Sequence, residues 1–186
     1  MKCGLYEEVI IAGFGGQGVI LLGKLLATTA MKAGFQVTYM PSYGAEVRGG
    51  TANCMVIIAD EPIASPLVSR PSSLIVMNKA SLNKFAPRLQ PGGLLVMNRS
   101  LIEGGPDRCD VEVIAIPADE IAVGIDAPKS ANMVALGAYL QKRGICSIDM
   151  VAASLPDVLA PRLHQTIPAN VEALRRGGNW PQNSGI

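Results

Sequence analysis

Charged residues are scarce in this chain of 186 residues: they make up 17 %, against 49 % apolar residues. Basic and acidic residues nearly balance, 16 against 15, so the net charge of +1 gives no electrostatic reason to expect nucleic-acid or membrane-surface binding. No apolar run approaches the roughly 18 residues of a membrane span, and the start MKCGLYEEV has acids where a secretory signal has its apolar region. We therefore expect one cytoplasmic, globular domain, and a chain this weakly charged often covers part of its surface with a partner.

Cysteine and histidine are also sparse. The four cysteines, at 3, 54, 109 and 146, are too far apart for the C-x-x-C spacings of zinc sites and iron–sulfur clusters. A chain long enough to fold on its own core has no need of a disulfide framework. Cys54 lies in a strand-like run and is expected to be a buried apolar residue. The single histidine, His164, has no nucleophile nearby in the sequence, so neither a metal site nor a histidine-based triad is predicted.

Short β-rich runs alternate with helical stretches along the whole chain. This alternation predicts an α/β fold: a single three-layer α/β/α domain with a mixed, largely parallel sheet, Rossmann-like in organisation. No helix separates the run at 51–60 from the strand before it, so that run is expected to be antiparallel. The segment 60–71 holds three prolines and is expected to be a loop. Strands are predicted at 8–13, 35–40, 51–60, 74–77, 94–98 and 111–116, and helices at 19–34, 78–86 and from 118 onward.

The stretch between the first strand and the first helix is rich in glycine. Gly13, Gly15 and Gly18 have the spacing G-x-G-x-x-G, which in dinucleotide sites brings backbone N–H groups and a helix N-terminus to a pyrophosphate. That fingerprint also needs an acid at the end of the second strand, and residues 39–41 read YMP there. A dinucleotide site is therefore disfavoured. A tight packing turn and an anion seat both remain open, and Gln17 could cap the helix or point into a site.

A second unusual stretch, PSYGAEVRGGTANC at 41–54, sets Tyr43, Glu46 and Arg48 among glycines. The two charged residues could pair with each other, which would contribute about 0–1 kcal/mol on a surface. Arg48 could instead clamp a carboxylate or a phosphate with its planar fork. Glu46 could be the carboxylate that protonates a thiamine ring. Both glycine-bearing loops follow strands, so we expect them at the same carboxyl edge of the sheet, where ligands and partners of α/β proteins gather.

The two loops together carry a resemblance to a known family. GFGGQGV and PSYGAEVRGGTANC, with DEPIASPLV, LQPGGLLVMN, IPADEIA, ANMVALGA and ANVEALRRG in order along the chain, closely resemble the gamma subunit of the 2-oxoacid:ferredoxin oxidoreductases. The resemblance implies that residues 1–176 are a pyruvate/ketoisovalerate oxidoreductase gamma-type catalytic domain, followed by a loose tail at 177–186. It also implies a multi-subunit enzyme that oxidatively decarboxylates a 2-oxoacid to acyl-CoA and CO2 and reduces ferredoxin.

The resemblance further implies how the cofactors are shared. Thiamine diphosphate and the iron–sulfur clusters would be bound by alpha, beta or delta subunits, coenzyme A would be a substrate of the complex, and this chain would hold no cofactor or complete active site alone. The sequence YGAEVRGGTANC is most similar to the corresponding segment of the 2-oxoglutarate enzymes. The smaller subunit of an indolepyruvate or pyruvate enzyme is the alternative within the family. A free-standing Rossmann-like dinucleotide- or ligand-binding protein is the alternative from another class.

Within this family Glu46 is no longer expected to serve thiamine, and the role that remains is support of the active site, with help in presenting coenzyme A. We expect the two loops to form one composite surface that docks on the alpha and beta subunits, where Arg48 meets a carboxylate or phosphate and glycines allow close backbone approach. No catalytic residue is predicted. The candidate cofactor-binding or interface residues are Gly13, Gly15, Gly16, Gln17, Gly18, Tyr43, Glu46, Arg48, Gly49 and Gly50.

Three features of the C-terminal half suggest packing more than chemistry. Asn132, in the apolar helical stretch SANMVALGAYLQKRG, is expected to be a cap or a satisfied hydrogen-bonding residue. The small residues of 131–138 predict close helix packing, and Gly144 predicts the end of that helix. Trp180 could anchor a partner or lie in a loose terminus.

Overall fold

A six-stranded mixed sheet forms the centre of the computed structural model, which describes residues 4–43 and 51–181. The strand order is β2-β3-β1-β4-β5-β6, in which β1, β4, β5 and β6 are parallel and β3 runs antiparallel to both β1 and β2. The predicted mixed sheet and the antiparallel run at 51–60 are confirmed. The strands are β1 (Tyr6–Phe14), β2 (Gln36–Tyr43), β3 (Thr51–Ala59), β4 (Ser73–Val76), β5 (Leu94–Asn98) and β6 (Glu112–Ile116).

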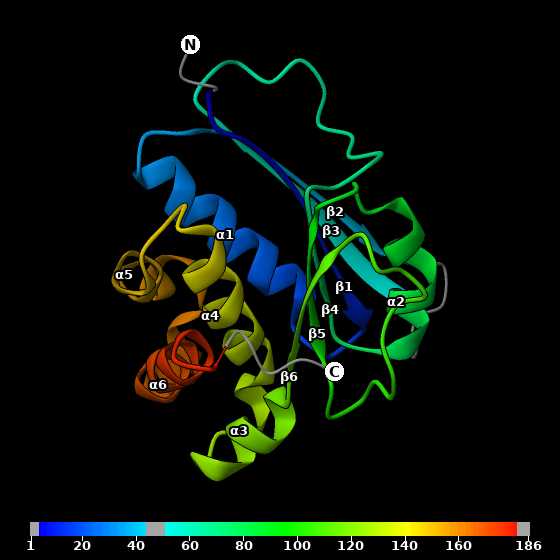
Figure 1. Cartoon of the computed structure of the whole chain (residues 1–186). Helices are drawn as coiled ribbons and strands as arrows, with labels where there is room; N and C mark the ends of the chain where they lie inside the picture. The colour runs from blue at the N-terminus through cyan, green and yellow to red at the C-terminus, as the bar shows by residue number, and fades with distance from the viewer. Residues whose placement is uncertain (1–3, 44–50, 182–186) are drawn as a thin grey trace.

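Helices cover both faces of this sheet, which completes the expected three layers. Figure 1 shows α1, α4, α5 and α6 on one side of the sheet and α2 on the other. Gly144, at φ 65°, ends α4 in the left-handed region as predicted, and α6 continues two residues beyond the expected end at 176. The helices are α1 (Val19–Lys32), α2 (Lys79–Phe85), α3 (Ala118–Gly124), α4 (Ala131–Arg143), α5 (Ile148–Val158) and α6 (Ile167–Gly178). Three 3-10 turns are η1 (Ala86–Arg88), η2 (Pro128–Ser130) and η3 (Pro161–Thr166).

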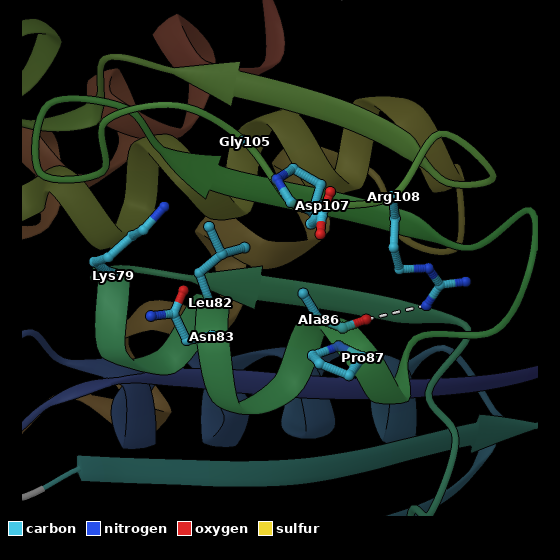
Figure 2. Close-up of a pocket in the computed structure, with 9 residues that line it drawn as sticks. Lys79, Leu82, Asn83, Ala86, Pro87, Gly105, Asp107 and Arg108 are labelled. Carbon is cyan, nitrogen blue, oxygen red and sulfur yellow. Dashed lines mark hydrogen bonds between the residues drawn. The ribbon is translucent and has the colours of Figure 1, made fainter.

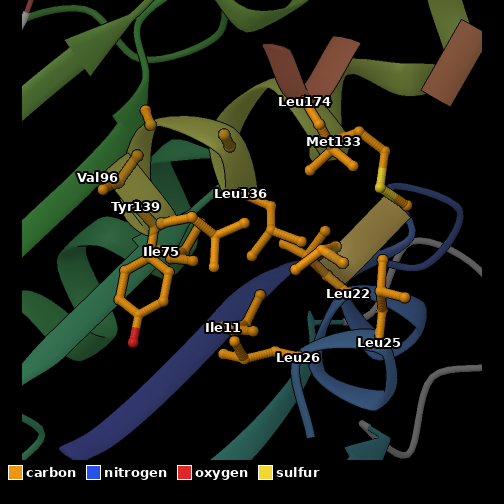
Figure 3. Close-up of a cluster of buried hydrophobic side chains, with 14 of the residues drawn as sticks. Ile11, Leu22, Leu25, Leu26, Ile75, Val96, Met133, Leu136, Tyr139 and Leu174 are labelled. Atoms are coloured by element: carbon orange, nitrogen blue, oxygen red, sulfur yellow. The ribbon is translucent and has the colours of Figure 1, made fainter. Parts of the chain in front are cut away.

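Two apolar cores lie on the two faces of the sheet. The larger one packs α1 and α4 against the strands, and Figure 3 shows Ile11, Leu22, Leu136 and Tyr139 meeting there. The smaller one packs α2 and the following turn against the opposite face. Strands β4 and β5 are buried along their whole length, as parallel strands covered on both faces should be, which explains their continuous apolar sequences. No helix in the described ranges is long and apolar enough to cross a membrane.

Helices α4 and α6 cross at glycines with almost no separation. A Cβ added at Gly137 would lie 2.0 Å from the carbonyl oxygen of Leu174, and one added at Gly177 would lie 1.9 Å from that of Val134. Only hydrogen fits at these two positions, so the two backbones can touch. The close packing predicted from the small residues of 131–138 is confirmed.

The arrangement of strands decides where the loops lie. Because β1 and β2 are both antiparallel to β3, they point the same way, and Phe14 and Tyr43 pair with Thr51 and Ala52 at the same edge. The chain after β1 enters α1 on one face of the sheet, whereas the chain after β4 enters α2 on the other face. The carboxyl edge between β1 and β4 is therefore a topological switch point, the usual place for a ligand in an open α/β sheet.

Candidate functional site

The switch point between β1 and β4 is closed by the side chain of Gln17. Its Oε1 accepts hydrogen bonds from the backbone N–H of Phe14 at 2.7 Å and from Nδ2 of Asn78 at 3.1 Å. Its Nε2 donates to the carbonyl oxygen of Met77 at 3.1 Å. Gln17 thus joins the loop after β1 to the loop after β4, and it does not cap α1. A pyrophosphate at this position would have to displace an amide whose hydrogen-bonding groups are already used.

The glycines of this loop divide into two kinds. Gly13 and Gly18 are packed: added Cβ atoms would lie 2.7 Å from Gln17 Oε1 and 2.4 Å from Asn132 Nδ2, respectively. Gly15 and Gly16 are exposed, and a Cβ on either would have no atom within 4 Å. Gly16 nevertheless needs to be glycine for its backbone, at φ 96°. The tip of the loop is therefore open to a ligand or a partner, while its two ends are fixed.

Asn132 fixes the second end of the glycine loop. It lies in the first turn of α4, is 5 % exposed, and donates from Nδ2 to the carbonyl oxygen of Gly18 at 3.3 Å. The prediction of a satisfied hydrogen-bonding residue is confirmed. Gly18 itself, at φ 71°, is the N-cap residue that directly precedes α1.

Two further amides hold the same edge, and sequence reasoning missed both. Asn78 Oδ1 accepts from the backbone N–H of Ser81 at 2.8 Å and caps α2. Asn98 is fully buried, and its Oδ1 accepts from the backbone N–H of Ala118 at 3.1 Å, at the start of α3. Nδ2 of Asn98 donates to the carboxylate of Asp119. A repeated sequence could have revealed them: Val-Met-Asn occurs at the carboxyl ends of both β4 and β5.

A groove of about 660 Å³ lies beside the glycine loop, between it and the turns η2 and η3. Its lining is mostly apolar, and its buried polar groups satisfy one another: Ser130 Oγ donates to Asn170 Oδ1 at 2.8 Å, and Asn170 Nδ2 donates to Thr166 Oγ1 at 3.2 Å. The N-termini of α1 and α4 both border the groove, and neither has an acid in its first turn. The positive ends of two helix dipoles therefore face the groove, and Asp126 is the acid among the residues that line it.

A second hollow, of about 580 Å³, lies between α2 and the connection from β5 to β6. Figure 2 shows Lys79 and Asn83 on the helix across from Asp107 and Arg108. Arg108 is held by the carbonyl oxygens of Ala86 and Leu89 and by both carboxylate oxygens of Asp110, and this hydrogen-bonded pair keeps the pKa of Asp110 below its usual value. With its guanidinium already bonded on these sides, Arg108 is poorly placed to bind an anion.

In the described part of the chain, the side chains that most often bind metals or act as nucleophiles are dispersed. Its His, Cys, Asp and Glu residues form no cluster of three that could hold a metal ion. His164 Nε2 lies 3.1 Å from the carbonyl oxygen of Leu159 and contacts no nucleophile. Cys54 is buried, as predicted, and desolvation raises the pKa of its thiol to about 12, so it stays protonated.

The second loop can be placed only at its two ends. Tyr43 is the last residue of β2 and pairs with Ala52, which brings the start of this loop to the edge that carries the glycine loop. The expected shared edge is confirmed. Glu46, Arg48, Gly49 and Gly50 lie outside the described residues, so the ion pair, the anion clamp and the composite surface stay predictions.

Comparison with known sequences gives a match over most of the chain. The family described as "Pyruvate ferredoxin/flavodoxin oxidoreductase" matches residues 8–180. Ketoisovalerate oxidoreductase subunit VorA of Methanothermobacter thermautotrophicus is 33 % identical over 95 % of this chain. The chain spans only 37 % of that relative's length. The 2-oxoglutarate synthase subunit KorC of Methanothermobacter marburgensis is 32 % identical over 92 % of this chain and 94 % of its own length.

Solved structures repeat the same pattern. The gamma subunit of a keto/oxoacid ferredoxin oxidoreductase from Geobacter sulfurreducens superposes with a TM-score of 0.81 at 26 % identity, covering 93 % of this chain and 94 % of its own. The 2-oxoglutarate:ferredoxin oxidoreductase of Magnetococcus marinus, solved with 2-oxoglutarate, coenzyme A and succinyl-CoA, gives 0.83 at 25 % identity. Its matching chain is longer: 93 % of this chain covers 30 % of it. The same fold therefore occurs both as a separate chain and as part of a longer one.

Proposed function

The chain belongs to the pyruvate ferredoxin/flavodoxin oxidoreductase family, and on that premise we propose that it is the gamma subunit of a multi-subunit 2-oxoacid:ferredoxin oxidoreductase. The observation that carries this proposal is the match over almost the whole length of separate subunits, KorC and the Geobacter gamma subunit. The described residues also hold no recognisable nucleophile–histidine pair or metal cluster, which suits a subunit that supports chemistry performed on its partners.

In this role the chain takes part in the oxidative decarboxylation of a 2-oxoacid to acyl-CoA and CO2, with transfer of the electrons to ferredoxin. Thiamine diphosphate and the iron–sulfur clusters belong to alpha, beta or delta subunits. We assign 2-oxoglutarate as the substrate, because a full-length relative and the Magnetococcus enzyme are both named for it. Ketoisovalerate is the rival that a specific observation favours, since VorA is equally similar over the same part of the chain. Cys54, Cys109 and Cys146 are free thiols, which suits a reducing cytoplasm.

The carboxyl edge of the sheet is the surface that we assign to the active-site side of the complex. The tip of the glycine loop is exposed there, and the loop at 44–50 begins beside it. Gly15 and Gly16 let a partner or coenzyme A approach the backbone closely, and Arg48 supplies a guanidinium for a carboxylate or phosphate.

Co-purification is the direct test of this role. A tagged chain, recovered from the source organism, should bring thiamine- and cluster-containing subunits with it, and the complex should reduce ferredoxin with 2-oxoglutarate faster than with pyruvate or ketoisovalerate. Recovery of the chain alone, without 2-oxoacid-dependent activity, would refute the proposal. A clear preference for ketoisovalerate would refute only the substrate.

Arg48→Ala tests the surface separately from the family role. We expect a weaker complex or a raised Michaelis constant for coenzyme A, while Arg162→Ala, a change of an exposed arginine outside the two loops, should leave both unchanged. Unchanged assembly and kinetics in every substrate would remove Arg48 from the site.

The alternative from another class is a free-standing dinucleotide-binding protein. Gln17 closes the position that a pyrophosphate would need. Neither neighbour of β1 brings an acid suited to a ribose to the carboxyl edge: the antiparallel β3 begins there at Thr51, and β4 is followed there by Met77 and Asn78. A rise in the unfolding temperature with NAD(H) would revive that reading, because a ligand of the folded state stabilises it.

A further inference from the structure

The end of α6 places Trp180 against α3 and next to the carboxyl end of β5. An open groove of about 360 Å³ lies between these elements. The guanidinium carbon of Arg99 lies 5.7 Å from the centre of the Trp180 ring. We call this surface the Trp180 patch; it comprises Arg99 and the groove residues Ile121, Gly124, Ile125, Arg176, Asn179 and Trp180.

Arg99 has no acidic partner among the described residues, whereas Arg176, the other arginine of the patch, pairs with Glu172. Arg99 is exposed, directly follows Asn98, and its recorded side-chain contact is with the face of the Trp180 ring. A guanidinium over an aromatic face has its charge attracted by the ring but keeps N–H donors for a second ligand. The arginines that pair with an acid are Arg108, Arg143, Arg175 and Arg176.

The charge and the composition of the patch indicate what would fit it. No acid is among the residues that line the groove, and of the two arginines of the patch Arg176 is already paired with Glu172, which leaves Arg99 as the guanidinium without an acidic partner among the described residues. Tryptophan and arginine beside an apolar pocket are the residues that dominate binding energy at protein interfaces. On the same helix α3, Val123 is 61 % exposed and adds apolar surface to this side of the molecule.

The position of the patch is also informative. Arg99 follows β5 just as the glycine loop follows β1, so both lie at the carboxyl edge of the sheet. Trp180 is the last residue matched by the family. It is half-buried and packs against the larger core, so it is an ordered part of the domain.

We propose that the Trp180 patch docks a segment of a partner subunit that carries a carboxylate next to an apolar side chain. The carboxylate pairs with Arg99, and the apolar side chain enters the groove beside Trp180. Charge complementarity selects this occupant, since the patch offers the Arg99 guanidinium beside apolar surface and no acid lines the groove. The inference rests on the proposed function, because it needs a partner subunit.

Binding between the purified chain and its co-expressed partner subunits tests the proposal, measured at low and high ionic strength. Arg99→Glu should raise the dissociation constant at least about thirtyfold and reduce its dependence on salt, because the contact is with a charge. Arg99→Lys, which keeps the charge and loses the planar fork, should give a smaller loss. The matched control is Arg70→Glu: Arg70 is equally exposed and precedes β4, at the opposite edge of the sheet.

The outcomes separate the alternatives. Equal effects of Arg99→Glu and Arg70→Glu, in variants whose unfolding temperatures match the wild type, overturn the docking site. An effect of Arg99→Glu on the Michaelis constant for coenzyme A with no effect on subunit affinity also overturns it, because the occupant is then a phosphate. Loss of a homodimer in Arg99→Glu, seen by sedimentation, overturns it in favour of a second copy. Failure of the wild-type chain to bind any partner refutes the proposed function itself.

Discussion

The two ends of the parallel strands, which we call the amino edge and the carboxyl edge of the sheet, are fixed by different interactions. At the amino edge, Glu7 is buried and accepts hydrogen bonds from Ser73 and Tyr139, and Arg143 lies 3.1 Å from the same carboxylate oxygen. Burial and the Glu7 charge raise the pKa of Tyr139 well above its usual value, so its hydroxyl stays a donor. At the carboxyl edge the ties are neutral amides: Gln17, Asn78, Asn98 and Asn132.

The difference shows how a fold can fix its loops without using up its charges. At the amino edge the buried Glu7 carboxylate is paired with Arg143, so this pair offers no net charge to a ligand. Amides at the carboxyl edge satisfy backbone groups and add no net charge of their own, and the exposed Arg99 and the N-termini of α1 and α4 lie at the same edge. The amides that fix the carboxyl edge, which we assign to binding, are neutral. The amino edge is instead fixed by a buried ion pair.

The largest effect is expected from breaking the amino edge. Glu7→Ala leaves Arg143 and Tyr139 without their carboxylate and should lower the free energy of unfolding by about 3 kcal/mol, the lower end for a broken buried pair because Arg143 is partly exposed. Urea denaturation measures it. Glu112→Ala, which breaks an exposed pair with Lys142, should cost less than about 1 kcal/mol. Similar losses for both variants would contradict a special role for the buried pair.

At the carboxyl edge, Asn98→Ala should be the most costly change. It leaves the buried N–H of Ala118 without an acceptor and removes the donor to Asp119, for a loss of about 2 kcal/mol. Chemical denaturation measures the loss. Asn83→Ala, which changes an exposed asparagine on α2, is the control that separates the contribution of the buried hydrogen bonds from the effect of removing an amide. A loss no greater than that of the control would mean that water replaces the amide.

Gln17→Ala should have a smaller effect, about 1 kcal/mol, because its surroundings are half-exposed and water can reach the freed groups. The sharper readout is hydrogen exchange: the amide of Phe14 should exchange faster, since Gln17 Oε1 is its acceptor. The exposed Gln165→Ala provides the matched change. Unaltered protection of Phe14 would show that Gln17 does not close the switch point.

The smallest expected effect is on the pH dependence of stability, and it comes from Glu8 near the amino edge. Desolvation, with the Glu7 charge second, raises the pKa of Glu8 above its ordinary value of 4.5. The folded state therefore holds this proton more tightly than the unfolded state, and stability falls as pH rises from 4.5 through the raised value. Glu8→Gln should remove that fall, seen as a flatter profile of urea midpoints from pH 4 to 7. A profile parallel to the wild type, as expected for Glu61→Gln on the surface, would assign the slope to other groups.

Most of the fold could be predicted because its signals are local. Alternating β-rich and helical stretches, and the missing helix before 51–60, fixed the strands and the antiparallel pair. The strand order could not be read this way: β3 inserts between β1 and β2, a choice made by packing between distant segments.

The candidate site was predicted less completely, for the same reason. Gly13 and Gly18 were identified from their spacing, but what they pack against comes from elsewhere in the chain: Asn132 lies 114 residues from Gly18. Gln17 is a candidate from the sequence, yet the carbonyl oxygen that accepts its hydrogen bond belongs to Met77, 60 residues away, which no local pattern predicts. Trp180 was recognised as a possible anchor, whereas its partner Arg99 follows from the tertiary fold alone.

Helix α4 connects the two edges of the sheet. It carries Asn132 at one end and Arg143 at the other, roughly 16 Å apart at 1.5 Å per residue. Where its glycine meets α6, the two backbones touch with no side chain between them that could flex or yield. One continuous helix therefore joins the residue that fixes the glycine loop to the residue that pairs with Glu7, so the geometry of the carboxyl edge and that of the amino edge depend on the same element.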